Sequence, residues 1–411
     1  MSPHASHDLQ EELDTIDPET RAKLTRAGFD AARLPSFLAL AKDLGHGTAA
    51  ERRDKRNRVP GPVEPPAEGE IWGIPQPGSE AYRRLEARGL EALKKGELAF
   101  AVLAGGMATR MGGVVKALVE VTSVPSAHTF LDVRLRENRF WSERSRSLGA
   151  GKPVPLWLMT SDATDGPTRE ALAAYSGKGN EHAHVKTFVQ DLGPRLTPDG
   201  HLFRGADGRP SLYSPGHGDL VDALRRSGLL RDFIAGGGRY VWIANLDNLG
   251  ATIDPMLLGL FIESRESQEA AGAERVEVMC EVTDKEPGDR GGIPVHALGK
   301  LQVLEEFRLP RDFDATKVTV FNTNTFLVSA QALATADIAW NWFEVEKNVE
   351  GKPAIQFERL LQELTGAMRA TYVRVPRHGA AARFLPVKDR EELEARRNTI
   401  LEVARSRGIL P

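Results

Sequence analysis

The sequence lacks most features of a secreted, membrane-spanning or nucleic-acid-binding protein. Its 411 residues include one cysteine, Cys280, which excludes an intramolecular disulfide and a metal site built from several cysteines. No apolar run approaches the ~18 residues that a membrane-spanning helix needs, and the first residues lack the pattern of a secretory signal. The formal charge of −3 gives the chain no overall attraction for nucleic acid or an anionic membrane. We therefore expect a cytoplasmic protein with no nucleic-acid or membrane partner, in which a local site holds any anionic ligand.

The first 80 residues differ in pattern from the rest of the chain. Asp17 and Pro18 are typical of the start of a helix and Gly28 of its end, and a second helical pattern covers residues 35–44. From Gly45 to Gly78 the apolar periodicity is lost, and a cluster of Arg and Lys precedes a cluster of prolines. No aromatic residues interleave with these charges, so a solvated connector is favoured over an RNA contact. We predict a helical N-terminal segment and a Pro/Arg-rich linker over residues 1–80.

Short apolar runs alternate with helical patterns over residues 81–390. Continuous apolar runs are typical of strands that are buried on both faces of a sheet, and their alternation with helices predicts an α/β domain with a largely parallel sheet. The expected strands are 98–103, 154–159, 240–244, 276–282 and 318–328, and the expected helices include 129–148, 168–175 and 220–234. Residues 391–411 are predicted to form a helical tail. Ligands of such sheets bind beyond the carboxyl ends of the strands, so the loops there are the candidate site.

A glycine-rich loop with two cations follows the first predicted strand. In Leu103-Ala-Gly-Gly-Met-Ala-Thr-Arg-Met-Gly-Gly-Val-Val-Lys116, Gly105 and Gly106 let the backbone approach a ligand closely, and Arg110 and Lys116 supply positive charge. The loop matches neither the dinucleotide fingerprint nor the P-loop, which argues against a nicotinamide dehydrogenase and a P-loop enzyme. A plain glycine-rich turn is the alternative interpretation of this loop taken alone.

Polar motifs also follow the later strands, in an order and spacing that is specific as a set. The motifs are Met159-Thr-Ser161, Phe188-Val-Gln190, Pro215-Gly-His-Gly-Asp219, Asn245-Leu-Asp-Asn-Leu-Gly-Ala251, Gly291-Gly292, Phe321-Asn-Thr-Asn324 and Phe384-Leu-Pro-Val-Lys388. From about Leu98 to Lys388, the sequence resembles the UTP:glucose-1-phosphate uridylyltransferase family. The resemblance implies a Rossmann-like (GT-A-like) nucleotidyltransferase fold with a mixed, mainly parallel sheet flanked by helices. It also implies a Mg²⁺-dependent reaction in which UTP and a sugar 1-phosphate give a UDP-sugar and pyrophosphate.

The resemblance assigns roles to individual residues. Lys116, Lys388 and Arg110 are the expected catalytic cations around the reacting phosphates, and Asp247 is the expected Mg²⁺ ligand. A helix N-cap is the alternative role for Asp247 or Asn248. The expected nucleotide-binding residues are Leu103, Gly105, Gly106, Met159, Gln190, Pro215, Gly216, His217 and Asn245. The expected sugar-binding residues are Gly218, Gly292, Glu305, Asn322 and Asn324, with Glu306 as the alternative to its neighbour because successive strand side chains face opposite ways.

The sequence departs from the family pattern at three places. Ala108 and Val115 stand where the family usually has a glycine and a proline, so the effect on the contact made by Lys116 stays open. Because the sequence ends 23 residues after Lys388, we do not expect the β-helix that eukaryotic members carry there, and the oligomeric state stays open.

Glucose 1-phosphate is the expected sugar substrate, and two other functions compete with this one. A UDP-N-acetylhexosamine or broad UDP-sugar pyrophosphorylase would share the fold and loop but seat a different sugar. A non-catalytic sensor would bind a nucleotide sugar without turnover, but it would not need both lysines and Asp247.

Overall fold

The computed structural model describes residues 4–108, 111–122, 127–175 and 184–410, and its centre is an eight-stranded sheet. In spatial order the strands are β2 (Ile71–Gly73), β19 (Ala370–Arg374), β13 (Val278–Asp284), β16 (Val320–Ser329), β12 (Tyr240–Asn245), β3 (Leu98–Leu103), β8 (Leu156–Thr160) and β9 (Val185–Val189). Strand β16 runs antiparallel to both of its neighbours, whereas the other pairings in this sheet are parallel. The predicted mixed, mainly parallel sheet is confirmed.

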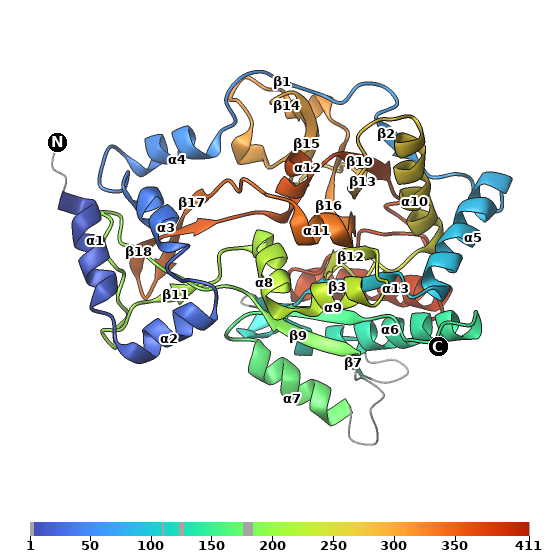
Figure 1. Ribbon diagram of the computed structural model, residues 1–411, viewed down its shortest axis with the longest axis horizontal. Coiled ribbons are helices and arrows are strands. Elements are labelled where there is room, and N and C mark those ends of the chain that lie inside the picture. Colours follow the sequence, from blue (N-terminus) through green and yellow to red (C-terminus); the bar gives the residue numbers. More distant parts are fainter. Residues whose placement is uncertain (1–3, 109–110, 123–126, 176–183, 411) are drawn as a thin grey trace.

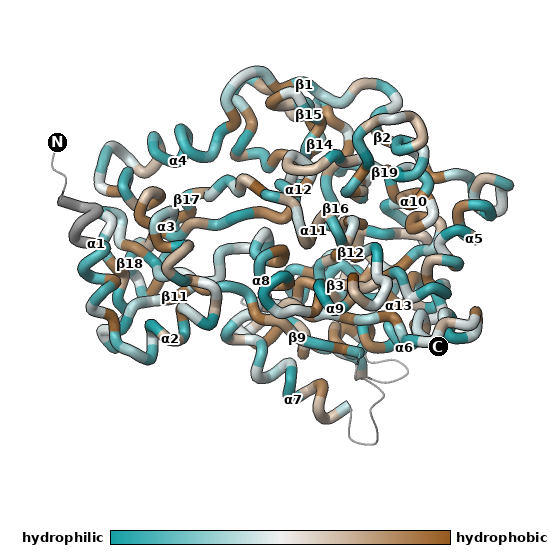
Figure 2. The backbone as a smooth tube through the Cα atoms, viewed as in Figure 1, coloured by the Kyte–Doolittle hydropathy of each residue, from teal (hydrophilic) through white to brown (hydrophobic). Residues whose placement is uncertain are grey.

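Two helical layers cover the sheet, because its strands are apolar on both faces (Figure 1). One layer contains α5 (Glu80–Lys94), α6 (Phe130–Ser147), α10 (Pro255–Ala270) and α13 (Arg390–Ser406). The other contains α8 (Leu220–Ser227), α9 (Leu229–Ala235), α11 (Ala330–Thr335) and α12 (Leu364–Ala367). Along β3, Phe100 and Val102 face the first layer, while Ala99 and Ala101 face the second. Figure 2 shows hydrophobic residues concentrated in the central strands and hydrophilic ones spread over the outer helices.

Small sheets and short helices extend this core. The small sheets pair β1 (Val63–Glu64) with β14 (Ile293–Ala297) and β15 (Lys300–Leu304), β17 (Phe343–Val349) with β18 (Lys352–Glu358), β10 (Gly193–Pro194) with β11 (Leu212–Tyr213), β4 (Met107–Ala108) with β5 (Val114–Val115), and β6 (Glu120–Thr122) with β7 (His128–Thr129). Helix α7 is Asp165–Tyr175, and 3-10 turns lie at Lys116–Leu118, His217–Asp219, Glu306–Arg308, Ala315–Lys317 and Leu361–Glu363. No helix within the described ranges has the length and apolar character to cross a bilayer.

The N-terminal residues pack on the rest of the chain more closely than a linker would. Helices α1 (His4–Asp14), α2 (Pro18–Arg26) and α3 (Leu34–Ala41) share an apolar cluster with the β17–β18 ribbon (Figure 1). Where the sequence predicts a solvated connector, a capping box of Thr48 and Glu51 starts helix α4 (Ala49–Asn57). Strand β2 then joins the edge of the central sheet.

Local signals explain where the other helices begin and end. The Asp17 carboxylate accepts a hydrogen bond from the backbone N–H of Thr20, as the predicted cap of α2 requires. The single helix predicted over 220–234 is wrong, because Gly228 adopts φ +78° and separates α8 from α9.

Helices α5 and α10 approach so closely that glycine is required at their crossing. A Cβ atom added to Gly259 would lie 1.9 Å from the carbonyl oxygen of Leu85. We expect Gly259→Ala to lower the free energy of unfolding by ~2–3 kcal/mol, because the helices must separate. Urea denaturation measures this, with Gly166→Ala in α7 as the control, since nothing lies within 4 Å of the added carbon there. Equal stability of the two variants would contradict the close crossing.

Candidate functional site

The glycine loop leaves β3 and returns Lys116 to the carboxyl edge of the sheet. Strands β4 and β5 form a hairpin, with Gly112 and Gly113 at positive φ in its turn. The backbone N–H of Lys116 donates to the carbonyl of Gly106 at 3.2 Å and so closes the loop. Val115 adopts φ −63°, the angle that a proline ring imposes, so the residue type usual in the family fits this backbone. The predicted catalytic residue Arg110 lies outside the described residues.

Lys116 forms an ion pair with Asp247, which follows β12. The Lys116 side chain is 17% exposed and that of Asp247 is 16% exposed, so both are partly accessible to a ligand. Strands β3 and β12 are parallel neighbours, and the loops that follow them therefore emerge at the same edge. The structure thus brings together a predicted catalytic lysine and the predicted metal ligand from positions 131 residues apart.

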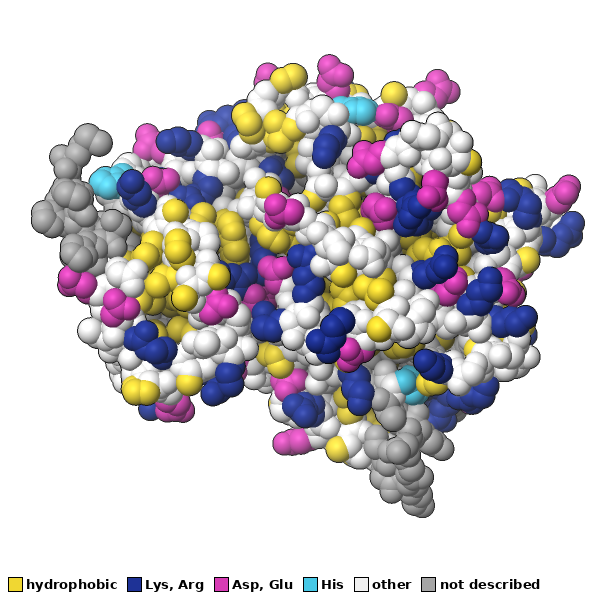
Figure 3. Space-filling model, viewed as in Figure 1, with side chains coloured by type: hydrophobic (Ala, Val, Ile, Leu, Met, Phe, Trp, Pro, Cys, Tyr) yellow, Lys and Arg dark blue, Asp and Glu magenta, His cyan; other side chains and the backbone are white. Residues whose placement is uncertain are grey.

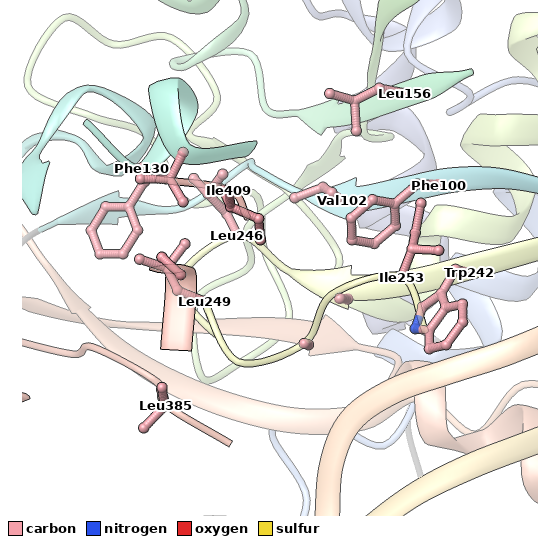
Figure 4. Close-up of a cluster of buried hydrophobic side chains, with 14 of the residues drawn as sticks. Phe100, Val102, Phe130, Leu156, Trp242, Leu246, Leu249, Ile253, Leu385 and Ile409 are labelled. Atoms are coloured by element: carbon pink, nitrogen blue, oxygen red, sulfur yellow. The ribbon is translucent and has the colours of Figure 1, made fainter. Parts of the chain in front are cut away.

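A buried arginine fixes the loop that carries Asp247. The guanidinium of Arg134 donates to the backbone carbonyls of Asn245 at 3.0 Å, Asn248 at 2.6 Å and Ala251 at 2.8 Å, and to Glu137 at 2.7 Å. Figure 4 shows Leu246, Leu249 and Ile253 of the same loop beside buried side chains of other elements, among them Phe100, Phe130 and Ile409, and Leu385 belongs to the same apolar cluster. Asp254 caps α10, so neither Asp247 nor Asn248 caps a helix there.

Lys388 approaches the site on a segment that is tied to the Asp247 loop. The side-chain oxygen of Asn248 accepts a hydrogen bond from the backbone N–H of Leu385 at 2.8 Å. The three Cα-to-Cα steps from Leu385 to Lys388 span at most ~10 Å, so Lys388 stays near Asp247. The Lys388 side chain is exposed and has no ion pair with any residue that the structure describes. It is therefore available to an anionic ligand.

Gln190, which follows β9, lies against both the glycine loop and the Pro-Gly-His-Gly motif. Its side-chain N–H donates to the carbonyl of Gly216 at 3.2 Å. A Cβ atom added to Gly105 would lie 2.6 Å from the Gln190 side-chain oxygen, so any larger residue at position 105 would push the Gln190 amide aside. The Gln190 side-chain amide therefore offers one hydrogen-bond donor and one acceptor at the position where the sequence predicts uracil recognition.

This contact makes Gly105 a sensitive position. With UTP as the substrate that the resemblance implies, we expect Gly105→Ala to raise KM for UTP about tenfold, because the methyl group must displace the Gln190 amide. Steady-state kinetics with UTP as the varied substrate measure the change, and a thermal melt reports whether the fold is intact. An unchanged KM would show that the position of Gln190 does not matter for UTP binding.

His217 is neutral, and one of its ring nitrogens is held by the backbone. Its Nδ1 atom accepts a hydrogen bond from the backbone N–H of Leu361 at 3.0 Å, so Nε2 carries the proton. Burial lowers the pKa of His217 to about 4, and the ring therefore stays a neutral donor at ordinary pH. The backbone N–H of Gly218, in contrast, donates to the carbonyl of Arg359 at 3.0 Å and is not free for a ligand.

The predicted sugar-binding asparagines lie next to the Asp247 loop. The side-chain amide of Asn324 donates to the side-chain oxygen of Asn245 at 2.8 Å. The backbone N–H of Asn324 donates to the side-chain oxygen of Asn322 at 2.8 Å. Asn324 adopts φ +56°, and its side-chain oxygen is buried without a hydrogen-bond partner among the described residues. A buried acceptor of this kind is costly unless a ligand satisfies it.

Gly292 and Glu305 extend this group. The carbonyl of Gly292 accepts from the backbone N–H of Asn322 at 2.8 Å, and a Cβ atom on Gly292 would lie 3.3 Å from the Glu305 carboxylate. Gln362 donates to Glu305 at 2.5 Å, and burial raises the pKa of this carboxyl group. Glu306 is exposed, so Glu305 is the inward member of the pair.

Three other predicted nucleotide-binding residues are held by contacts inside the protein. Leu103 ends β3 and its carbonyl accepts from the backbone N–H of Leu246 at 3.2 Å. The Pro215 carbonyl accepts from the backbone N–H of Arg359 at 2.8 Å. Met159 is 1% exposed and packs in the apolar cluster of the second helical layer, so it lies in the core that carries the site.

The buried arginines that hold these loops were not predicted from the sequence. Arg134 holds the Asp247 loop, and Arg359 contacts the motif around His217 through both its backbone and its side chain. Arg383 pairs with Glu281 through two hydrogen bonds of 2.7 and 2.8 Å and donates to the carbonyl of Thr252. Apart from Glu137, which pairs with Arg134, the partners named for these arginines are more than 100 residues away, and no local pattern distinguishes such arginines from solvated ones.

Comparison with known proteins agrees with this arrangement. UTP–glucose-1-phosphate uridylyltransferase from Hordeum vulgare is 31% identical over 310 residues, which are 71% of this chain and 59% of that protein. The enzyme of the same name from Musa acuminata is 32% identical over 325 residues, which are 74% of this chain and 63% of that protein. The chain therefore spans about three fifths of the length of these curated relatives.

Solved structures show the same fold at low sequence identity. A uridine diphosphate N-acetylglucosamine pyrophosphorylase from Trypanosoma brucei aligns with a TM-score of 0.71 and 22% identity, over 98% of this chain and 85% of that one. A UDP-glucose phosphorylase from the same organism aligns with a TM-score of 0.69 and 22% identity, over 96% and 78%. The nucleotidyltransferase fold predicted from the resemblance is thereby confirmed.

The family itself is fixed by a match along most of the chain. The sequence model described as UTP–glucose-1-phosphate uridylyltransferase matches residues 69–407, which include the described motifs from the glycine loop to Lys388. The chain therefore belongs to the UTP–glucose-1-phosphate uridylyltransferase family.

Proposed function

We propose that this chain transfers the uridylyl group of UTP to glucose 1-phosphate and releases pyrophosphate. The observation that carries the proposal is the meeting of Lys116, Asp247 and the Lys388 segment at one edge of the sheet. A phosphate oxygen of glucose 1-phosphate attacks the α-phosphorus of UTP, and the bond from that phosphorus to pyrophosphate breaks. Both reactants are anions, so the site must neutralise and align them rather than supply a covalent nucleophile.

The lysines supply the protein's own positive charge. Lys116 sits on the loop that would cover the triphosphate, and Lys388 is free to contact the two phosphates that react. Gln190 would read the uracil edge, and the neutral His217 would donate through Nε2 to the nucleotide. The buried side-chain oxygen of Asn324 would accept a hydrogen bond from a sugar hydroxyl.

Asp247 has the properties of a Mg²⁺ ligand that shares the ion with substrate. Among the described residues no three His, Cys, Asp or Glu side chains gather to form a metal site, so a cage made by protein alone is absent there. Mg²⁺ binds through one or two carboxylates together with substrate phosphates, and Asp247 offers one partly exposed carboxylate that already holds the Lys116 ammonium. Bound Mg²⁺ would stabilise the negative charge on the phosphates.

The experiment is a pyrophosphate-release assay with Mg²⁺, each of the four nucleoside triphosphates and a panel of sugar 1-phosphates. We expect release with UTP and glucose 1-phosphate above every other pair. Release with N-acetylglucosamine 1-phosphate alone would favour the UDP-N-acetylhexosamine pyrophosphorylase, and comparable rates with several sugars would favour a broad enzyme. No release with any pair, together with binding of a UDP-sugar, would favour the sensor.

A further inference from the structure

A group of six charged side chains, three of them buried, lies beside the proposed nucleotide site. Three carboxylates, of Asp191, Asp219 and Asp222, meet the guanidinium groups of Arg33, Arg226 and Arg359. The side chain of Asp191 is 2% exposed and that of Asp219 is 0% exposed, so water cannot neutralise their charge. Burial and the nearby Asp219 raise the pKa of Asp191 to about 6, as expected for a carboxylate in so crowded a position.

Two of these carboxylates, those of Asp191 and Asp219, belong to residues that lie within two positions in the chain of the ones that would contact the nucleotide. Asp191 follows Gln190 directly, and its backbone N–H donates to Asp219. Asp219 in turn closes the Pro215–Asp219 motif, and Arg359 contacts that motif through its own backbone. Any shift of Asp191 is therefore passed to Gln190 through one peptide unit and to the motif through Asp219.

Arg33 is the member of the group that comes from the N-terminal helices. It precedes α3, forms an ion pair with Asp191, and lies 3.6 Å from Asp219 and 3.9 Å from Asp222. Its guanidinium stacks over the Trp342 ring, 5.4 Å from the ring centre, as that of Arg359 does at 5.1 Å. With Arg33 the group contains three cations and three anions, and without it the buried Asp191 loses one of the two guanidinium groups in closest contact with it and keeps that of Arg226.

We infer that Arg33 is a positioning residue for nucleotide recognition: the N-terminal segment holds Gln190 in place by pairing with Asp191. The inference rests on the proposed function, since it takes Gln190 as the uracil-reading residue. It gives the N-terminal helices a part in binding UTP through a contact with Asp191, the residue after Gln190.

The sugar side offers an internal control, because it is held by other contacts. Asn322, Asn324 and Glu305 form hydrogen bonds with Gly292, Asn245 and Gln362, and in the described part of the chain no hydrogen bond or ion pair joins them to the six charged residues. Loss of Arg33 should therefore affect one substrate and spare the other. A purely structural role would disturb both.

The test compares Arg33→Met with the double variant Arg33→Met/Asp191→Asn. We expect Arg33→Met to raise KM for UTP about tenfold and to change KM for glucose 1-phosphate less than about twofold. The double variant removes both members of the ion pair, and KM for UTP should return to within about threefold of the original value. Arg26→Met is the matched control, because Arg26 is an exposed arginine of the same segment.

Two readouts separate failure of the inference from failure of the proposed function. Calorimetric titration with UTP measures nucleotide binding without turnover, and the same order of affinities is expected there. Any of three results would overturn the inference alone. Turnover could be unchanged in Arg33→Met, KM could rise equally for UTP and glucose 1-phosphate, or the double variant could bind UTP no better than the single one. UTP binding with the expected order but no product would overturn the proposed function alone. If Arg33→Met does not fold, Arg33→Lys replaces it, and a rise in KM for UTP that Asp191→Asn relieves is again required.

Discussion

Replacing Lys388 by alanine is expected to lower kcat for UDP-glucose synthesis about a thousandfold, while KM for UTP changes far less. The reason is that Lys388 would meet charge that develops as the phosphates react, and such a cation contributes more in the transition state than in the ground state. Asp247→Ala should cause a loss of similar size, because it removes the carboxylate that would hold Mg²⁺. Stopped and continuous pyrophosphate assays under saturating substrates measure kcat directly.

The controls for these variants come from the opposite edge of the sheet. Lys95 is an exposed lysine at the end of α5, just before β3 begins, and Lys95→Ala should leave kcat unchanged. Both Lys388→Ala and Asp247→Ala should melt close to the unsubstituted protein, since neither side chain is part of the core. A loss of less than about threefold in Lys388→Ala would remove this lysine from the reaction.

Arg134→Met should have the largest effect on stability, because it leaves several buried groups without a partner. The buried Glu137 carboxylate loses its cation, and the carbonyls of Asn245, Asn248 and Ala251 lose their donor. We expect the free energy of unfolding to fall by ~3–5 kcal/mol, the usual cost of removing one member of a buried ion pair. At temperatures where the variant is still folded, kcat should also fall, because the loop carrying Asp247 is no longer fixed.

Arg136→Met is the matched control, since Arg136 is exposed and lies two residues after Arg134 on the same helix. Its unfolding free energy should differ from that of the unsubstituted protein by less than ~0.5 kcal/mol. Urea denaturation followed by circular dichroism gives both values. Arg134→Met with unchanged stability would mean that water or other groups replace the guanidinium, contrary to the burial described above.

Five of the eight central strands were predictable because a buried strand leaves a strong local pattern, whereas β2, β9 and β19 were not among the expected strands. The run at 98–103 corresponds to β3 without error, and those at 154–159, 276–282 and 318–328 differ from β8, β13 and β16 by one or two residues. The antiparallel direction of β16 could not be foreseen, since an apolar run carries no sign of its direction. The helix break at Gly228 was missed for a different reason, because the apolar periodicity continues on both sides of it.

The loops that form the site were predictable from the sequence, but the residues that hold those loops in place were not. Strand ends placed Lys116 and Asp247 at one edge, and their ion pair follows from the parallel pairing of β3 with β12. The residues that hold those loops, such as Arg134 and Arg359, act over long sequence distances that no local pattern reveals. The Arg/Lys-rich stretch before Pro60 was interpreted as solvated for the same reason, although Arg52 forms an ion pair with the buried Glu344 at 3.2 Å.

Charge on the outer surface gives no comparable guide to function. The face shown in Figure 3 carries Lys and Arg side chains interspersed with Asp and Glu. The proposed activity therefore depends on where a few charges meet in the site, and the overall balance of −3 does not reveal it.

The most direct test is a crystal structure of the protein with UDP-glucose and Mg²⁺. The account predicts that the two phosphates lie between Lys116 and Lys388, with the metal on Asp247 and the uracil against Gln190. A nucleotide seated elsewhere, for example in the 390 Å³ cavity at the opposite edge that Arg239, Arg265 and Arg275 line, would contradict it.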